Sequence, residues 1–396
     1  MTMKGTNHHS LASLLRTGGG HCWLGWLVWL VPLAIISVIV AIDPFKRTVT
    51  QTYHEAVVHW WDRQPIYVGT RGMNYLPHFV PLFSLFALLP YALCDVLWRW
   101  AAVAGFGTGL WRFTGTLSGQ NRNRDFALVS VLVMPLCLGA LGNGQANAHF
   151  GASLLLAAWC LHERRWWWAT GCLCLLVALK PLGISAVGLA MIAFPCLWWR
   201  LGLGLGLLAI FPYCFGPPEY VTQQYIAFAR NLTECFAPSP RSFADINGLL
   251  RPFGFKLTGE LSLVVRASAG VALIGACALA ARLGYDLRRS LLWLGFSASY
   301  LMLFNPMTEA NSYAILAPAL ALWAWRHARH GEIQTSRWLL AMILAMSLLS
   351  YVMRPWFQND FTKTWHPAMA LVFLGLLIRE ACRPGAENER PFQTSG

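Results

Sequence analysis

The chain has 396 residues, of which 56% are hydrophobic and only 12% are charged, and its mean hydropathy is +0.48. Soluble domains carry about 25% charged residues, so this composition excludes an ordinary soluble domain and predicts an all-α polytopic membrane protein. The formal net charge of +13 does not indicate nucleic-acid binding, because the basic residues are scattered at the ends of apolar runs, where the positive-inside rule accounts for them.

The first apolar run, 22–42, contains no charged residue and is long enough to cross a bilayer. It is too long for the core of a signal peptide, and no small-residue cleavage site follows it, so we expect a retained helix after a cytoplasmic tail of residues 1–21. Together with later runs it predicts a bundle of about twelve transmembrane helices within a membrane domain of residues 22–380, followed by a tail of residues 381–396. The later runs are 98–117, 125–142, 147–162, 167–181, 183–199, 201–216, 261–281, 290–305, 312–326, 337–354 and 365–379.

Arginine clusters between these runs set the expected orientation. If the N-terminal tail is cytoplasmic, every cluster falls on the cytoplasmic side, and so does the C-terminal tail. This requires that 76–97 does not cross the membrane, and Pro77, Pro81 and Pro90 interrupt that segment. We therefore expect 43–97 to form a long outer loop with juxtamembrane or re-entrant helices. The clusters are Arg112/Arg122/Arg124, Arg164/Arg165, Arg200, Arg282/Arg288/Arg289 and Arg326/Arg329.

Within this loop, residues 48–61 (TVTQTYHEAVVHWW) have the spacing of an amphipathic helix that lies along the outer surface. The apolar side is expected to hold Val49, Tyr53, Val57, Trp60 and Trp61, and the polar side Thr50, His54 and Glu55. A zinc motif needs two histidines four residues apart on one helix face, whereas His54 and His59 are five apart. No Cys-x-x-Cys pair occurs among the 11 cysteines either, so no metal site is predicted.

Two polar interruptions of the apolar pattern are candidates for a substrate site. Gln145 and Asn147 lie in GNGQANAHF, residues 142–150; this is either a plain polar turn or a source of carboxamides that hydrogen-bond to sugar hydroxyls. Lys180, followed by Pro181, ends a later run. Its ammonium either snorkels to phospholipid phosphates or binds the phosphate of a substrate at the membrane boundary.

Two acids stand at expected outer helix ends. Asp43, directly after the first run, is either a general base that faces a lipid-borne substrate or a capping residue before a helix. Glu309, in NPMTEANSY, is either an interfacial charge or an acceptor for a substrate hydroxyl. The sequence leaves both alternatives open.

Short motifs occur in a fixed order across about residues 50–325. They are Tyr53-x-x-Ala56 with Trp60, Pro65-Ile66-Tyr67, Tyr75-Leu76-Pro77 with Pro81 and Pro90, Gly144-Gln145-x-Asn147, Lys180-Pro181, Asn247-Gly248 with Arg251, and Asn305-Pro306. Together these motifs resemble glycosyltransferase family 87, whose members are membrane mannosyltransferases of the GT-C class that use polyprenyl-phosphate-mannose. In many members an acid lies a few residues before the tyrosine that matches Tyr53, whereas this chain has Val49, Thr50 and Gln51 there. A histidine common near the later proline motif is absent, and Glu309 and Asn311 lie nearby instead.

The resemblance implies a GT-C-like bundle that transfers a hexose, with mannose expected, from a polyprenyl-phosphate donor to a lipid or glycan acceptor, with inversion, at the outer face of the plasma membrane. The leaving group is already a phosphate, so no metal or cofactor is expected. Besides the donor and the acceptor, membrane lipids are expected partners, and nucleic acid is not an expected partner. The rival class is a transporter or flippase of lipids or lipid-linked sugars, which would show two related halves with helices broken near the midplane; no duplicated half is visible in the sequence.

The resemblance also implies roles for particular residues. The expected roles are general base for Asp43 with Glu309 in reserve, phosphate binding for Lys180 with Arg251, sugar orientation for Gln145, Asn147 and Asn247, and further substrate contacts for Tyr75 and His54.

Overall fold

The computed structural model describes residues 22–45, 48–67, 73–118, 121–235, 243–282, 286–357 and 360–383. Helices account for nearly all of these residues, and no strand occurs among them. The prediction of an all-α membrane protein is therefore confirmed. The main helices are α2 (Cys22–Ile42), α3 (Thr50–Trp61), α4 (Phe79–Ala87), α5 (Tyr91–Ser118), α6 (Arg122–Gly142), α7 (Ala146–His162), α8 (Trp166–Leu179), α9 (Gly183–Ala193), α10 (Trp198–Ile210), α11 (Pro218–Cys235), α12 (Ile246–Leu250), α13 (Gly259–Arg282), α14 (Asp286–Phe304), α15 (Ala317–Arg329), α16 (Ile333–Leu344), α17 (Ser350–Phe357) and α18 (Asp360–Cys382).

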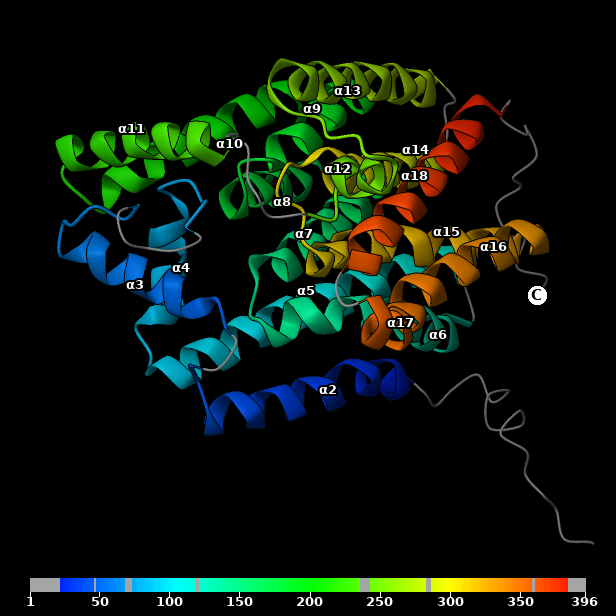
Figure 1. Cartoon of the computed structure of the whole chain (residues 1–396), viewed down its shortest axis with the longest axis horizontal. Coiled ribbons are helices and arrows are strands. Elements are labelled where there is room, and N and C mark those ends of the chain that lie inside the picture. The colour runs from blue at the N-terminus through cyan, green and yellow to red at the C-terminus, as the bar shows by residue number, and fades with distance from the viewer. Residues whose placement is uncertain are drawn as a thin grey trace, which may run out of the picture.

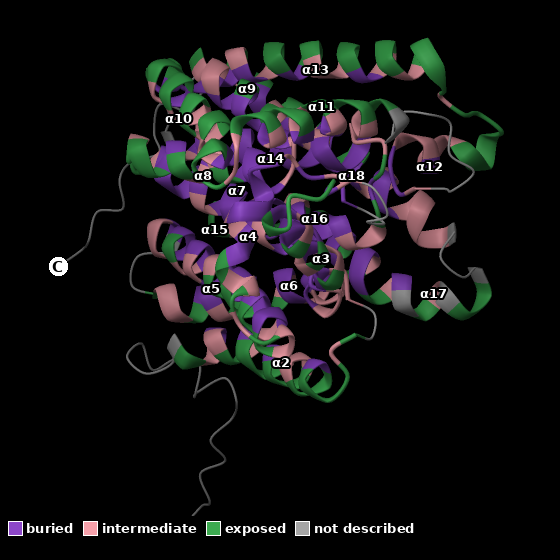
Figure 2. Cartoon of the chain, turned by 90° about the vertical axis from the view of Figure 1, so that its left-hand side faces the viewer, coloured by how far each residue is buried: buried purple, intermediate pink, exposed green. Residues whose placement is uncertain are grey.

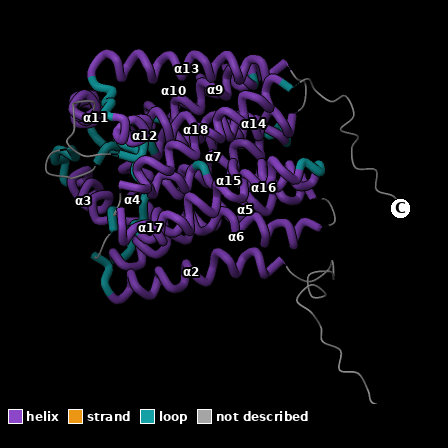
Figure 3. Tube along the Cα trace, turned by 45° about the vertical axis from the view of Figure 1, so that its right-hand side comes forward, coloured by secondary structure: helices purple, strands orange, loops and turns teal. Residues whose placement is uncertain are grey.

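The long helices run side by side in one bundle, with α2 along one edge and α13 along the opposite edge (Figures 1 and 3). Helix α7 lies at the centre and packs against α5, α8 and α14. Figure 2 shows buried positions concentrated in the middle of the bundle and exposed positions on α2, α13 and α11. The edge helices expose apolar side chains such as Ile35 and Val271, which is the pattern expected for surfaces that face lipid.

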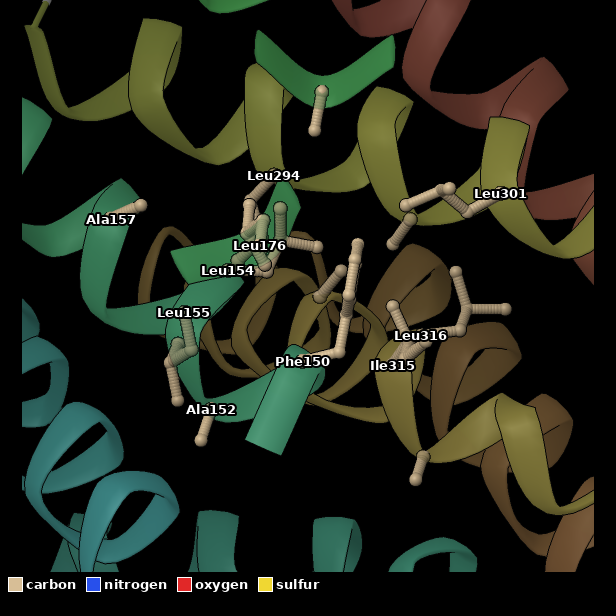
Figure 4. Close-up of a cluster of buried hydrophobic side chains, with 14 of the residues drawn as sticks. Phe150, Ala152, Leu154, Leu155, Ala157, Leu176, Leu294, Leu301, Ile315 and Leu316 are labelled. Carbon is tan, nitrogen blue, oxygen red and sulfur yellow. The ribbon is translucent and has the colours of Figure 1, made fainter. Parts of the chain in front are cut away.

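Aliphatic and aromatic side chains fill the centre of the bundle. Figure 4 shows Phe150 and Leu154 of α7 among residues of α8 and α14 and the two residues before α15, Ile315 and Leu316, with Leu176 and Leu294 beside them. These side chains are all buried. Close packing of this kind stabilises the bundle through van der Waals contacts between the helices, because lipid tails are as apolar as these side chains.

Within the described residues, five helices are long and apolar enough to cross a membrane, or six if one bent pair counts as a span. The expected number of about twelve spans is therefore not confirmed. Some expected spans are shorter apolar helices, such as α8 and α9. The five are Trp23–Ile42, Arg122–Gly142, Pro195–Cys214, Gly259–Arg282 and Phe361–Cys382.

The expected boundary between spans at residue 200 is wrong. Helix α9 ends at Ala193, and Pro195–Cys214 forms the next apolar helix. Proline disfavours the helical conformation of the residue before it and lacks an N–H donor. Accordingly, Phe194 has φ −136° and ψ 78°, outside the helical region.

The segment 76–97, expected not to cross, forms two helices. Helix α4 and the first turns of α5 are separated by a break at Pro90, and the two helices are bent by 118°. Such a bend fits a broken span or a re-entrant loop, as the prolines predicted. Helix α5 then continues as a 28-residue helix from Tyr91.

The amphipathic helix expected at 48–61 is present as α3, with two residues on the opposite side from that predicted. Tyr53, Val57 and Trp60 are buried as expected, but Thr50 is buried as well and Trp61 is exposed. Helix α11 contacts the segment after α3, because the side-chain oxygen of Gln224 accepts a hydrogen bond from Ile66 N at 3.1 Å.

Two ends of the bundle are named by their elements. We call one end of the bundle the turn end: it contains the turn between α6 and α7, the start of α5, and the ends of α8 and α14. The basic end is where α5 ends and α6 begins, and it also holds the end of α7 and the start of α8. Successive antiparallel helices thus bring residues far apart in sequence to the same end.

Candidate active site

The turn between α6 and α7 contains one residue with a left-handed backbone, Gly144, directly before Gln145. Gly144 has φ +62°, a conformation that side chains disfavour, and a Cβ there would meet Thr50 Cγ2 at 2.8 Å. Gln145 then adopts an extended backbone (φ −72°, ψ 141°) as the residue before α7. The GNGQ sequence therefore forms a tight, specified turn rather than a loose loop.

Four consecutive carbonyls of this turn accept hydrogen bonds from outside it. The donors come from the start of α5 and from the residue before α3, so two other parts of the chain fix the turn together. The bonds are Arg99 Nε to Leu141 O (2.6 Å), Arg99 Nη2 to Gly142 O (3.1 Å), Val49 N to Asn143 O (3.0 Å) and Trp98 Nε1 to Gly144 O (3.0 Å).

Arg99 is itself held by a buried ion pair with Asp95, one helical turn earlier. The side chains are 1% and 0% exposed, and the Thr50 hydroxyl donates to Asp95 Oδ1 at 2.6 Å. The pair was not predicted from the sequence, because Asp95 was assigned to the outer loop 43–97 and Arg99 to the span 98–117. The available signal was an acid and a base at i and i+4 in LCDVLWRW.

From this turn a chain of amide hydrogen bonds leads to a carboxylate. Asn147 Nδ2 donates to Gln145 Oε1 at 2.9 Å, and Gln145 Nε2 donates to Glu309 Oε2 at 2.9 Å. Asn147 Nδ2 also donates to Ser312 Oγ at 3.0 Å. Asn147 is 3% exposed, and its Oδ1 has no partner among the described residues. The chain leaves Glu309 exposed, with one carboxylate oxygen fixed by Gln145.

Two tyrosines adjoin the same turn. The hydroxyl groups of Tyr53 and Tyr75 are 2.6 Å apart, and Ala146 N donates to the Tyr53 oxygen at 3.3 Å. Burial raises the pKa of Tyr53 to about 12, and the nearby charge of Glu309 adds to that rise. The pKa of Tyr75 is also well above its usual value, chiefly because of burial. Both phenols therefore stay neutral and act as hydrogen-bonding groups.

Lys180 is the first residue after α8 and adopts an extended backbone (φ −156°, ψ 136°). Burial lowers the pKa of Lys180 to about 8, and the charge of Glu309 opposes part of that shift. No hydrogen bond or ion pair joins its ammonium to another described residue. The structure thus places a half-buried cation within range of the charge of an exposed carboxylate, and the two do not form an ion pair.

A second buried pair supports the segment before Glu309. Asp245 pairs with Arg266 at 2.9 Å and caps α12 by accepting from Asn247 N at 3.0 Å. Ala244 N donates to Thr308 O at 2.7 Å, which links this pair to the residue next to Glu309. Sequence analysis missed Asp245 and Arg266 as well, since 21 residues separate them and no local pattern signals their contact.

The remaining expected site residues lie in other surroundings. Asn247 closes a loop, because its Oδ1 accepts from Leu257 N at 2.8 Å and its Nδ2 donates to Leu257 O at 3.2 Å. Arg251 is exposed in the next turn. The ring of His54 lies edge-on to Tyr91, with centroids 5.6 Å apart.

Asp43 is exposed directly after α2, and its N–H donates to Ile39 O at 3.0 Å. The residue before α3 is Val49, so the interpretation of Asp43 as the cap of that helix is wrong. The hydrogen bonds that join Gln145, Asn147 and Glu309 do not include Asp43.

One group of metal-capable side chains occurs among the described residues, and it is not at this site. His327, Glu332 and Glu380 lie close together near the ends of α15 and α18. Arg383 already forms ion pairs with Glu332 at 3.0 Å and with Glu380 at 2.7 Å. A guanidinium therefore occupies the position between the carboxylates.

Comparison with known families identifies the class of protein. The profile of glycosyltransferase family 87 matches residues 74–306, more than half of the chain. The chain therefore belongs to glycosyltransferase family 87 and is a membrane glycosyltransferase, which uses a sugar donor and an acceptor. A comparison with curated proteins gives no match. The matched range includes Tyr75, Gln145 and Lys180, while Glu309 follows it by three residues.

Proposed function

We propose that the protein transfers a hexose, with mannose expected, from a polyprenyl-phosphate donor to a lipid or glycan hydroxyl, with inversion. The turn end would face the outer side of the plasma membrane, with both termini cytoplasmic. The observation that carries this proposal is the presence of Glu309, Gln145 and Lys180 around one rigid turn. A carboxylate can take the proton of an attacking hydroxyl, and a cation can stabilise a departing phosphate.

Glu309 is the carboxylate best placed for the general base. Gln145 holds its Oε2, and Oε1 makes no hydrogen bond with another described residue. A base fixed through one oxygen is oriented while the other oxygen stays available to an acceptor hydroxyl. Asp43, the residue first expected in this role, has no such support from Gln145 or Asn147. We therefore assign Glu309 the role of base and treat Asp43 as dispensable for proton transfer.

Lys180 is the candidate phosphate ligand. A half-buried ammonium without a protein counter-ion contact is costly near a membrane, and an incoming phosphate would offset that cost. The neutral hydroxyls of Tyr53 and Tyr75, together with the unpartnered Oδ1 of Asn147, supply hydrogen-bonding groups of the kind that orient a sugar. A phosphate leaving group with a lysine ligand accounts for this arrangement without a metal.

The test is transfer of radiolabelled sugar by the purified protein in lipid vesicles. Polyprenyl-phosphate hexoses and nucleotide hexoses are offered separately, with the Lys180→Ala variant as control. We expect transfer from a polyprenyl-phosphate hexose and a large loss in the variant. Transfer from nucleotide sugars alone would overturn the donor assignment.

A further inference from the structure

A cluster of arginines lies at the basic end, away from the candidate active site. Four of the eight cation–π contacts among the described residues occur here, and they connect into one series that we call the arginine–tryptophan ladder. The distances from guanidinium carbon to ring centroid are 3.3 Å for Arg122 and Trp111, 5.2 Å for Arg112 and Trp111, 5.1 Å for Arg112 and Trp159, and 4.9 Å for Arg165 and Trp159. Three helices, α5, α6 and α7, and the residue before α8 contribute to it.

The three arginines of the ladder differ in how their donors are used. Arg122 donates from Nε to Trp111 O at 2.9 Å, which fixes the first step of the ladder. The guanidinium groups of Arg112 and Arg165 make no hydrogen bond or ion pair with another described residue, and both residues are exposed. When a guanidinium stacks on the face of an indole, the contact uses the plane of the guanidinium, and the N–H donors at the edge of the guanidinium stay available. The ladder therefore positions two sets of unused donors beside one indole.

The charge around the ladder is strongly positive. Arg124 and Arg164 lie close by in sequence. Of the acids nearby, Asp125 is buried in the first turn of α6, and Glu163 lies 3.9 Å from the His162 ring. Among the described residues, no carboxylate forms an ion pair with Arg112 or Arg165.

The surroundings of the ladder are those of a membrane boundary. The ends of α5 and α7 lie next to the start of α8, where Trp167 and Trp168 are 55% and 71% exposed. Exposed tryptophans at helix ends mark the level of lipid head groups. The unused guanidinium donors are consequently expected at the depth of phospholipid phosphates.

We propose that the arginine–tryptophan ladder binds the phosphate of an anionic phospholipid through Arg112 and Arg165. Arginine forms short charge-assisted hydrogen bonds with phosphate oxygens, and basic sites between transmembrane helices bind acidic head groups. A lipid rather than a dissolved anion fits, since exposed tryptophans beside the ladder can contact the glycerol and acyl region. This site is separate from the sugar-transfer site, so it does not depend on the proposed function.

The proposal is tested by titrating the purified protein in detergent with palmitoyl-oleoyl phosphatidylglycerol and counting bound lipid by native mass spectrometry. Arg112→Gln/Arg165→Gln should bind at least about tenfold more weakly than the wild type. Arg282→Gln/Arg329→Gln removes the same charge from the basic end outside the ladder and should bind like the wild type. Arg112→Lys/Arg165→Lys should fall between them, because it keeps charge and loses the planar stacking.

Three results would overturn the proposal. Equal loss in both double Gln variants would show a general charge effect, and unchanged binding in Arg112→Gln/Arg165→Gln would remove the site. Displacement of the lipid by an equal concentration of inorganic phosphate would show a site for free anions instead. All variants should unfold at the same temperature as the wild type, which shows that they are folded. If Arg112→Gln/Arg165→Gln unfolds, Arg112→Lys/Arg165→Lys supplies the folded comparison.

Discussion

Two kinds of charged pair lie at the turn end, and they differ in where their hydrogen bonds go. Asp95 and Arg99 are almost completely buried; the Asp95 carboxylate holds the guanidinium of Arg99, which donates to backbone carbonyls of the α6–α7 turn. The charge of Glu309 acts on Lys180, but the two do not form an ion pair, and among the described residues the Glu309 carboxylate accepts a hydrogen bond from Gln145 alone. The first pair thus builds the site, while the second remains available to a substrate.

Removal of Arg99 should have the largest effect and should act on stability. Arg99→Ala leaves Asp95 buried without its cation and frees the carbonyls of Leu141 and Gly142. Breaking a buried pair from one side costs about 3–5 kcal/mol. Thermal unfolding in detergent measures this, with Lys180→Ala as the matched loss of one cation. An Arg99→Ala protein as stable as Lys180→Ala would remove the distinction between the two pairs.

Lys180→Ala should affect catalysis rather than stability. If its ammonium stabilises the departing phosphate, kcat/KM for the donor should fall by about 10²–10³. Lys180→Arg should retain part of the activity because it keeps the charge. Donor titrations with both variants measure this, and unchanged donor use in Lys180→Ala would leave only a lipid-snorkelling role.

The pH dependence of donor use should report the same lysine. Burial lowers the pKa of Lys180 from 10.5 to about 8, so the ammonium is charged below that pH and loses its proton above it. The value of kcat/KM should therefore fall by about tenfold for each pH unit above the pKa. Lys180→Arg should lack this decline, since a guanidinium remains charged. Identical profiles in the two proteins would assign the titration to another group.

Asn247→Ala should have the smallest effect. Both of its amide atoms bind the backbone of Leu257, so the substitution should cost about 1–2 kcal/mol of stability and leave kcat/KM for the donor unchanged. Unfolding and donor titration together measure this. A rise in donor KM without loss of stability would restore the sugar-orienting role expected from sequence.

The fold was predictable where one physical signal dominates. The first run gave the bounds of α2, 22–42, because it is apolar and uncharged over its whole length, and Pro32 lies inside the helix without ending it. The boundary near residue 200 failed since hydropathy alone does not mark the break at Phe194, which depends on Pro195. The side of α3 on which Thr50 lies depends on its hydrogen bond to Asp95, a contact 45 residues away that no local periodicity reveals.

The candidate site was predictable in part for the same reason. Gln145, Asn147 and Lys180 stood out as polar residues in apolar runs, and Glu309 as an acid at a helix end. Their grouping depends on the packing of helix ends that are distant in sequence. Asn247 has the same polar character but serves a loop, which only its contacts with Leu257 reveal.

The most direct test of the account compares Glu309→Gln with Asp43→Asn in a single-turnover sugar-transfer assay. Glu309→Gln keeps an oxygen that can accept from Gln145 and removes only the ability to take a proton. We expect its rate to fall at least about a hundredfold, and Asp43→Asn to react at nearly the wild-type rate. A large loss in Asp43→Asn together with normal transfer by Glu309→Gln would contradict the account and place the base at the end of α2.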